Sequence, residues 1–126
     1  MTHVVKEAHK YHTSFISGIP ENMVIEVNKG LEKVDDFDFN VFEFDKLVEK
    51  KLLFCVLTFI LNKYNFIKDL LVEKNYINFI NEVTSGYNRK ITYHNDLHAT
   101  DVLQTSYILI SKGNLYNVRI ISLNPY

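Results

Sequence analysis

Residues 92–107 read TYHNDLHATDVLQTSY and combine the clearest helix start in the chain with most of its chemically active side chains. Asn95 and Asp96 are residue types that favour the beginning of a helix, because their side chains accept hydrogen bonds from free backbone N–H groups. Apolar residues then recur at spacings that form a broad stripe on a helix. We therefore predict a helix that starts here, continues to about residue 111 and packs against a core.

Two histidines and an aspartate are spaced to share one face of this helix. His98 follows His94 by four residues, and Asp101 follows His98 by three, so on a helix their side chains would project together. His94 would lie at the mouth of the first turn and His98 one turn in. A zinc-protease helix is excluded, because the residue after the first histidine is Asn95 and not the glutamate that serves as its general base.

The rest of the chain also shows helical patterns. Residues 50–64 are apolar on nearly every side and predict a buried helix, and residues 66–73 and 76–83 predict two more. A short helical segment over residues 21–28 is expected to close at Gly30. Neither a β-hairpin signal nor a repeat appears, so the predicted fold class is all-α, a helical bundle.

An acidic and aromatic stretch over residues 34–40 precedes one of these helices. Alternation of Asp and Phe is compatible with a short strand or with an extended segment that pins Phe37 and Phe39 to a core. A calcium loop is a weaker alternative, because the glycine and terminal glutamate of such a loop are missing. We predict an aromatic anchor followed by a helix that begins within residues 42–47.

Composition excludes several classes of protein. The 126 residues are 47% apolar, with 9 Phe and 8 Tyr, which favours a packed core over disorder. With 14 basic and 15 acidic residues, nucleic acid is not expected as a partner.

The single cysteine, Cys55, is expected to be a buried thiol, which fits a reducing, cytoplasmic location. The longest apolar run, residues 52–61, falls short of the ~20 residues of a membrane span, and no signal peptide is evident. His9 and His12 are predicted to be solvated and not to bind metal.

The run TYHNDLHATDVLQ resembles the first signature of the class I 3′,5′-cyclic nucleotide phosphodiesterases, Tyr-His-Asn-x-x-His-Ala-x-Asp-Val-x-Gln. Residues 34–47, VDDFDFNVFEFDKL, are similar to an upstream region of the same family, with Phe37 where the family often has Trp. The likeness covers roughly residues 34–120. The matching positions of the signature are Tyr93, His94, Asn95, His98, Ala99, Asp101, Val102 and Gln104.

The resemblance implies a role for each of the chemically active positions. In the family, cyclic AMP or cyclic GMP is hydrolysed at a centre of zinc and a second divalent ion, commonly magnesium, which together activate the attacking hydroxide and neutralise phosphate charge. His98 matches a zinc ligand, and His94 matches the histidine that protonates the departing 3′ oxygen. Tyr93 matches a residue beside the substrate phosphate. Asp101 and Gln104 are expected either to orient a metal-binding side chain without binding the metal themselves, or to pack the helix.

The resemblance also implies ligands that this sequence lacks. The family's other metal ligands include a later His-Asp pair, whereas the five histidines here are followed by Val, Lys, Thr, Asn and Ala. We therefore expect residues 1–33 to be a helical lead-in and residues 34–126 to be part of a catalytic domain, truncated before that motif. The cyclic nucleotide would be the substrate, and the missing part or another subunit would be the partner. The alternative is an inactive helical fragment or a protein-interaction module.

Overall fold

The computed structural model describes residues 19–113, and within this range every regular element is helical. The predicted all-α fold is therefore confirmed. His9 and His12, with the segment after residue 113, lie outside the described residues. The elements are the 3-10 helices η1 (Glu21–Met23), η2 (Lys33–Asp35) and η3 (Glu49–Lys51), and the α-helices α2 (Val24–Glu32), α3 (Val41–Val48), α4 (Leu52–Lys63), α5 (Phe66–Asp69), α6 (Glu73–Ser85) and α7 (Asp96–Lys112).

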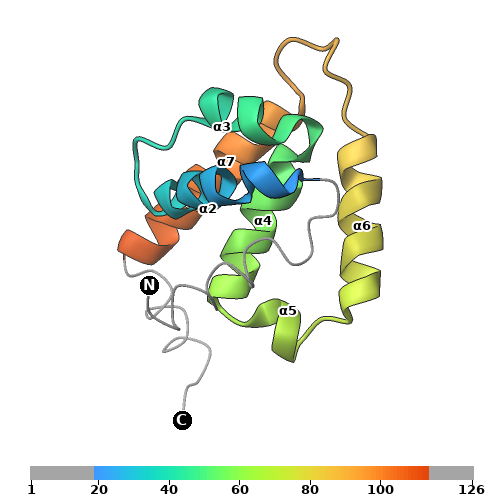
Figure 1. Ribbon diagram of the computed structural model, residues 1–126. Helices are drawn as coiled ribbons and strands as arrows, with labels where there is room; N and C mark the ends of the chain where they lie inside the picture. Colours follow the sequence, from blue (N-terminus) through green and yellow to red (C-terminus); the bar gives the residue numbers. More distant parts are fainter. Residues whose placement is uncertain (1–18, 114–126) are drawn as a thin grey trace.

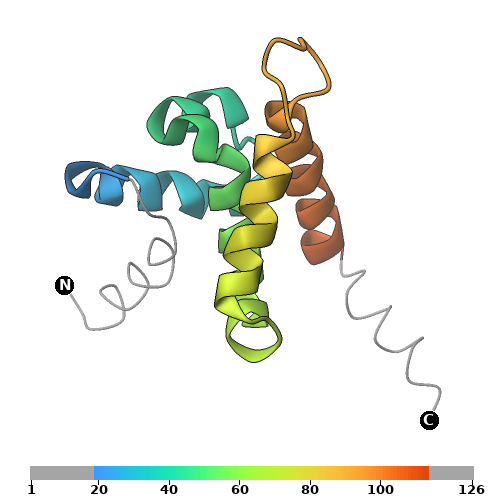
Figure 2. The same ribbon diagram turned by 90° about the vertical axis from the view of Figure 1, so that its right-hand side faces the viewer.

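The apolar helix predicted for residues 50–64 is α4, and it forms the centre of the bundle. Figures 1 and 2 show α2 and α7 on opposite sides of it, with α6 covering a third side. Cys55 and Val56 are fully buried, and Thr58 shares a buried hydrogen bond of 2.7 Å with the hydroxyl of Tyr76 on α6. Within residues 19–113 no helix has the length and apolar character needed to cross a bilayer.

Gly30 does not end the first helix, contrary to the expectation from sequence. The helix α2 continues through it to Glu32. A Cβ atom at this position would lie only 2.6 Å from Cδ2 of Phe44. Gly30 is therefore explained by the close approach of the Phe44 ring, which a side chain would obstruct.

The acidic stretch over residues 34–40 forms no strand. It consists of the end of η2, a turn in which the N–H of Phe39 donates to the carbonyl of Asp36, and an extended lead into α3. This turn leaves Phe37 65% exposed, so Phe37 is no anchor, whereas Phe39 is half-buried with its ring centroid 5.7 Å from that of Phe44. Asn40 caps α3 by accepting from the N–H of Phe42.

The two helices expected around residues 66–83 divide differently from the prediction. The helix α5 is a single turn, and an extended residue, Val72, separates it from α6, which begins earlier than predicted, at Glu73. Glu73 in the first turn of α6 complements the positive end of the helix dipole. The helix α6 ends at Ser85, two residues beyond the predicted end at residue 83.

Candidate functional site

The helix α7 begins where the sequence predicted. Asn95 is extended and buried, and its Oδ1 accepts from the backbone N–H of His98 at 3.1 Å, which caps the first turn. Its amide Nδ2 donates to the carbonyl of Ile91 at 3.0 Å. Asn95 therefore joins the helix to the loop that precedes it.

The structure brings three of the predicted site residues together. The ring centroid of His98, in the first turn of α7, lies 4.4 Å from that of Tyr93 and 6.0 Å from that of His94. His94 is exposed and lies in the loop before Asn95, not on the helix. The idea that both histidines project from one helix is therefore wrong, and the loop brings His94 close to the first turn of α7.

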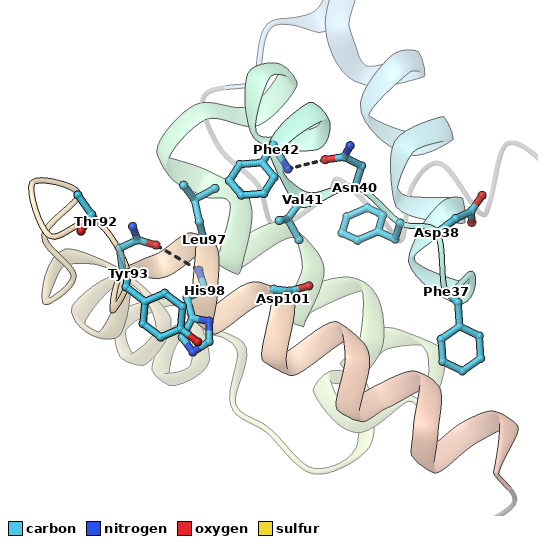
Figure 3. Close-up of a pocket in the computed structure, with 12 residues that line it drawn as sticks. Phe37, Asp38, Asn40, Val41, Phe42, Thr92, Tyr93, Leu97, His98 and Asp101 are labelled. Atoms are coloured by element: carbon cyan, nitrogen blue, oxygen red, sulfur yellow. Dashed lines mark hydrogen bonds between the residues drawn. The ribbon is translucent and has the colours of Figure 1, made fainter.

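A cleft of about 500 Å³ opens beside this ring cluster. Figure 3 shows Tyr93 and His98 at one end, Asp101 in the middle and Phe37 at the other end. Its rim is unusually aromatic, because Phe37, Phe42 and Tyr93 are each more than 60% exposed. The cleft is lined by Phe37, Asp38, Phe39, Asn40, Val41, Phe42, Thr92, Tyr93, Asn95, Leu97, His98 and Asp101.

The described part of the chain does not by itself fit a complete metal centre. Within residues 19–113 no group of three or more His, Cys, Asp or Glu side chains could hold a metal ion. Structural and catalytic zinc sites use at least three protein ligands. His98 offers one imidazole to such a site, and Asp101 is an exposed carboxylate in the middle of the cleft.

Gln104 lies away from the ring cluster and is almost fully buried. Its Nε2 donates to the carbonyls of Val34 and Asp36 at 2.9 and 2.8 Å. These bonds attach α7 to the segment that leads into Phe37 and the cleft. Gln104 thereby holds one wall of the cleft on the helix that carries His98.

Tyr107 extends the same attachment one turn further along α7. Its hydroxyl donates to Oδ1 of Asp35, while Nζ of Lys63 lies 2.6 Å from the other carboxylate oxygen. Burial and then the bond to Asp35 raise the pKa of Tyr107 to about 12. Burial alone would lower the pKa of Lys63, but its hydrogen bonds to Asp35 and Tyr107 raise it. The group joins η2, α4 and α7.

Sequence reasoning missed Arg89. The guanidinium donates to both carboxylate oxygens of Asp45 on α3, at 2.8 Å each, and to Asp96 at 2.6 and 2.9 Å. These hydrogen bonds raise the pKa of Arg89 above its ordinary value. Asp45 is 44 residues away in the chain, so no local pattern signals this contact.

The curated proteins that match the chain include the following two. The 3′,5′-cyclic-AMP phosphodiesterase 4 of Dictyostelium discoideum is 31% identical over 79 residues, which cover 62% of this chain and 8% of that protein. The dual specificity calcium/calmodulin-dependent 3′,5′-cyclic nucleotide phosphodiesterase 1 of Drosophila melanogaster is 28% identical over 107 residues, 83% of this chain and 12% of that protein. This chain therefore matches only about a tenth of the length of these relatives.

No protein-family model matches the chain, and no solved structure matches it significantly. The two relatives described above are nevertheless both named as cyclic nucleotide phosphodiesterases. Their likeness agrees with the signature that contributes Tyr93, His94 and His98 to the ring cluster. We conclude that this chain contains a phosphodiesterase-like region.

Proposed function

We propose that this chain supplies part of a catalytic domain that hydrolyses 3′,5′-cyclic nucleotides, cyclic AMP, cyclic GMP or both, to 5′-nucleoside monophosphates. The observation that carries the proposal is the cluster of Tyr93, His94 and His98, with centroid separations of 4.4 to 6.0 Å. The names of the two relatives support the same reaction. Because the chain spans about a tenth of the length of these relatives, the proposal assigns the rest of the active site to another part of the protein or to a partner.

The exposures of the three residues suit their proposed roles. His94 is exposed, so it is accessible to the leaving oxygen of a bound substrate, to which it would deliver a proton. His98 is half-buried, which suits a side chain that holds a fixed position. Tyr93 is 62% exposed at the mouth of the cleft, where it can contact bound substrate.

The proposal includes zinc and a second divalent cation, magnesium. When bound, the two ions would supply an activated hydroxide and neutralise phosphate charge. His98 would contribute one zinc ligand. Because the described residues do not complete a site, the remaining ligands belong to another part of the protein or to a partner, and we derive no step through the metals.

The proposal is tested first on the natural message. The transcript that encodes residues 34–126 is sequenced in both directions, and its longest protein product is assayed for hydrolysis of cyclic AMP and cyclic GMP with zinc and magnesium present. We expect turnover that falls by roughly 10²–10⁴-fold in His94→Ala and is abolished in His98→Ala. Lys90→Ala, which changes an exposed side chain of the same loop, is the control and should keep full activity.

Two results would refute this function. One is a longest product that hydrolyses neither nucleotide, and the other is full activity in His98→Ala. Loss of turnover in Lys90→Ala as well would show that the assay reports general damage to the loop and does not support the assigned roles.

A second candidate function is binding of another polypeptide without catalysis. It is favoured by apolar side chains that the fold leaves exposed on α7, namely Val102, Leu109 and Ile110, each 45% exposed or more. A protein product that melts cooperatively as a monomer, hydrolyses no cyclic nucleotide and loses no stability in His98→Ala would favour this alternative.

A further inference from the structure

The loop between α6 and α7, residues 86–95, carries Tyr93 and His94. Figures 1 and 2 show it extending beyond the ends of both helices. Within the loop, the N–H of Ile91 donates to the carbonyl of Asn88 at 3.0 Å. Bonds of this kind fold the loop on itself but do not attach it to the rest of the bundle.

Arg89 makes that attachment through charged hydrogen bonds. It forms a two-pronged pair with Asp45 of α3, and a second pair with Asp96, the first residue of α7. It also donates to the carbonyl of Glu49 at 3.4 Å. A planar guanidinium with five donors can serve all three groups at once, which a lysine ammonium cannot do with the same geometry.

The partner on α7 makes this pair costly to break. The Asp96 side chain is only 4% exposed, and a buried carboxylate without a partner is strongly unfavourable. Arg89 and Asn95 therefore hold the loop on either side of Tyr93 and His94. Between these two points lie Tyr93 and His94, whose ring centroids are 4.4 and 6.0 Å from that of His98 in the first turn of α7.

We infer that Arg89 is a positioning residue: by pairing with Asp45 and Asp96 it holds Tyr93 and His94 over His98. The importance of this role for catalysis rests on the proposed function, in which His94 is the proton donor and His98 is a metal ligand. The geometry itself can be measured on the 126-residue chain without any turnover, so the two claims are tested separately.

The test compares the wild-type chain with Arg89→Gln by proton NMR. The ring-centroid separation of 4.4 Å predicts a cross-peak between the Tyr93 ring and the His98 imidazole, and a ring-current shift of the His98 signals. We expect Arg89→Gln to lose the cross-peak and most of the shift, while signals from the buried Thr58 and Tyr76 contact stay in place. Lys90→Gln changes the next cation of the loop and should leave every one of these signals unchanged.

A second variant keeps the test valid if Arg89→Gln does not fold. The double substitution Arg89→Gln with Asp96→Asn removes both charges, so no buried carboxylate is left without a partner. It too should lose the cross-peak, and Arg89→Lys should recover it in part. A folded variant without Arg89 that retains the full Tyr93 to His98 cross-peak would overturn the inference, whatever the turnover of the longer product.

Discussion

Replacing Gly30 with alanine should destabilise the fold, although Gly30 lies inside a helix. The added Cβ would lie 2.6 and 2.7 Å from Cδ2 and Cε2 of Phe44, well inside the ~3.5–4.0 Å at which carbon atoms attract one another. Phe44 is only 3% exposed and its ring packs against Phe39. The ring cannot swing into solvent, so either α2 or α3 must move.

The magnitude follows from two opposed effects. Overfilling a packed core costs about 1–3 kcal/mol, and a contact this short belongs near the upper end of that range. Alanine in place of glycine within a helix stabilises the fold by about 0.5–1 kcal/mol. The net expectation is a loss of about 1–2 kcal/mol, which corresponds to a fall in Tm of roughly 4–10 °C for a domain of this size.

The assay is reversible unfolding of the 126-residue chain by urea and by heat. Gly86→Ala is the matched control, because its Cβ would lie 3.4 Å from the nearest atom, the carbonyl oxygen of Val83, and its φ of −71° suits alanine. We expect Gly86→Ala to be neutral or to gain up to about 1 kcal/mol. Gly30→Ala combined with Phe44→Leu should recover part of the loss. If Gly30→Ala were as stable as the wild type, the reasoning from the Phe44 contact would be wrong.

Three further outcomes are expected. Gln104→Met keeps the volume but removes the buried donor to the carbonyls of Val34 and Asp36, of which Asp36 still accepts from the N–H of Phe39. The free energy of unfolding should therefore fall by about 1–3 kcal/mol. Thr105→Ala, at an exposed position, should change it by less than about 0.5 kcal/mol. Burial raises the pKa of Cys55 to about 12. The Cys55 thiol of the folded chain should therefore resist iodoacetamide at pH 8 and react once the chain is unfolded in guanidinium. Labelling of the native chain would contradict this expectation. Because the pKa of Tyr107 rises from 10.0 to about 12 on folding, its contribution to stability is complete below pH 10 and is lost as the pH rises towards 12. Between pH 10 and pH 12 the free energy of unfolding should therefore fall less in Tyr107→Phe than in the wild type. Equal falls would show that the loss of stability does not come from Tyr107.

The parts of the fold that the sequence predicted well depend on local signals. The run of apolar residues that became α4 leaves a helix no polar face, so it had to be central. The start of α7 was predictable because the cap of Asn95 is made within three residues, to the N–H of His98. In both cases the deciding interaction lies within the element or one turn from it.

The contacts that shape the candidate site were not predictable in this way. Gln104 and Val34 are 70 residues apart, and Tyr107 and Asp35 are 72 apart. The role of Gly30 was predicted wrongly for the same reason, because it depends on the close approach of the Phe44 ring from α3. A sequence pattern within a short window does not show which side chains from distant parts of the chain will pack against it.

The histidine pair shows how such a limit affects a functional interpretation. Spacing alone placed both imidazoles on one helix, which would have made their separation a property of the helix itself. In the structure the helix begins at Asp96, so only His98 is fixed by it, and His94 is placed by a loop. The separation of a proposed proton donor from a proposed ligand then depends on what holds that loop. In this chain Arg89 does so, through a residue on α3 and a buried residue on α7. A signature can therefore be present in full while the relative position of its two histidines is decided by residues outside it.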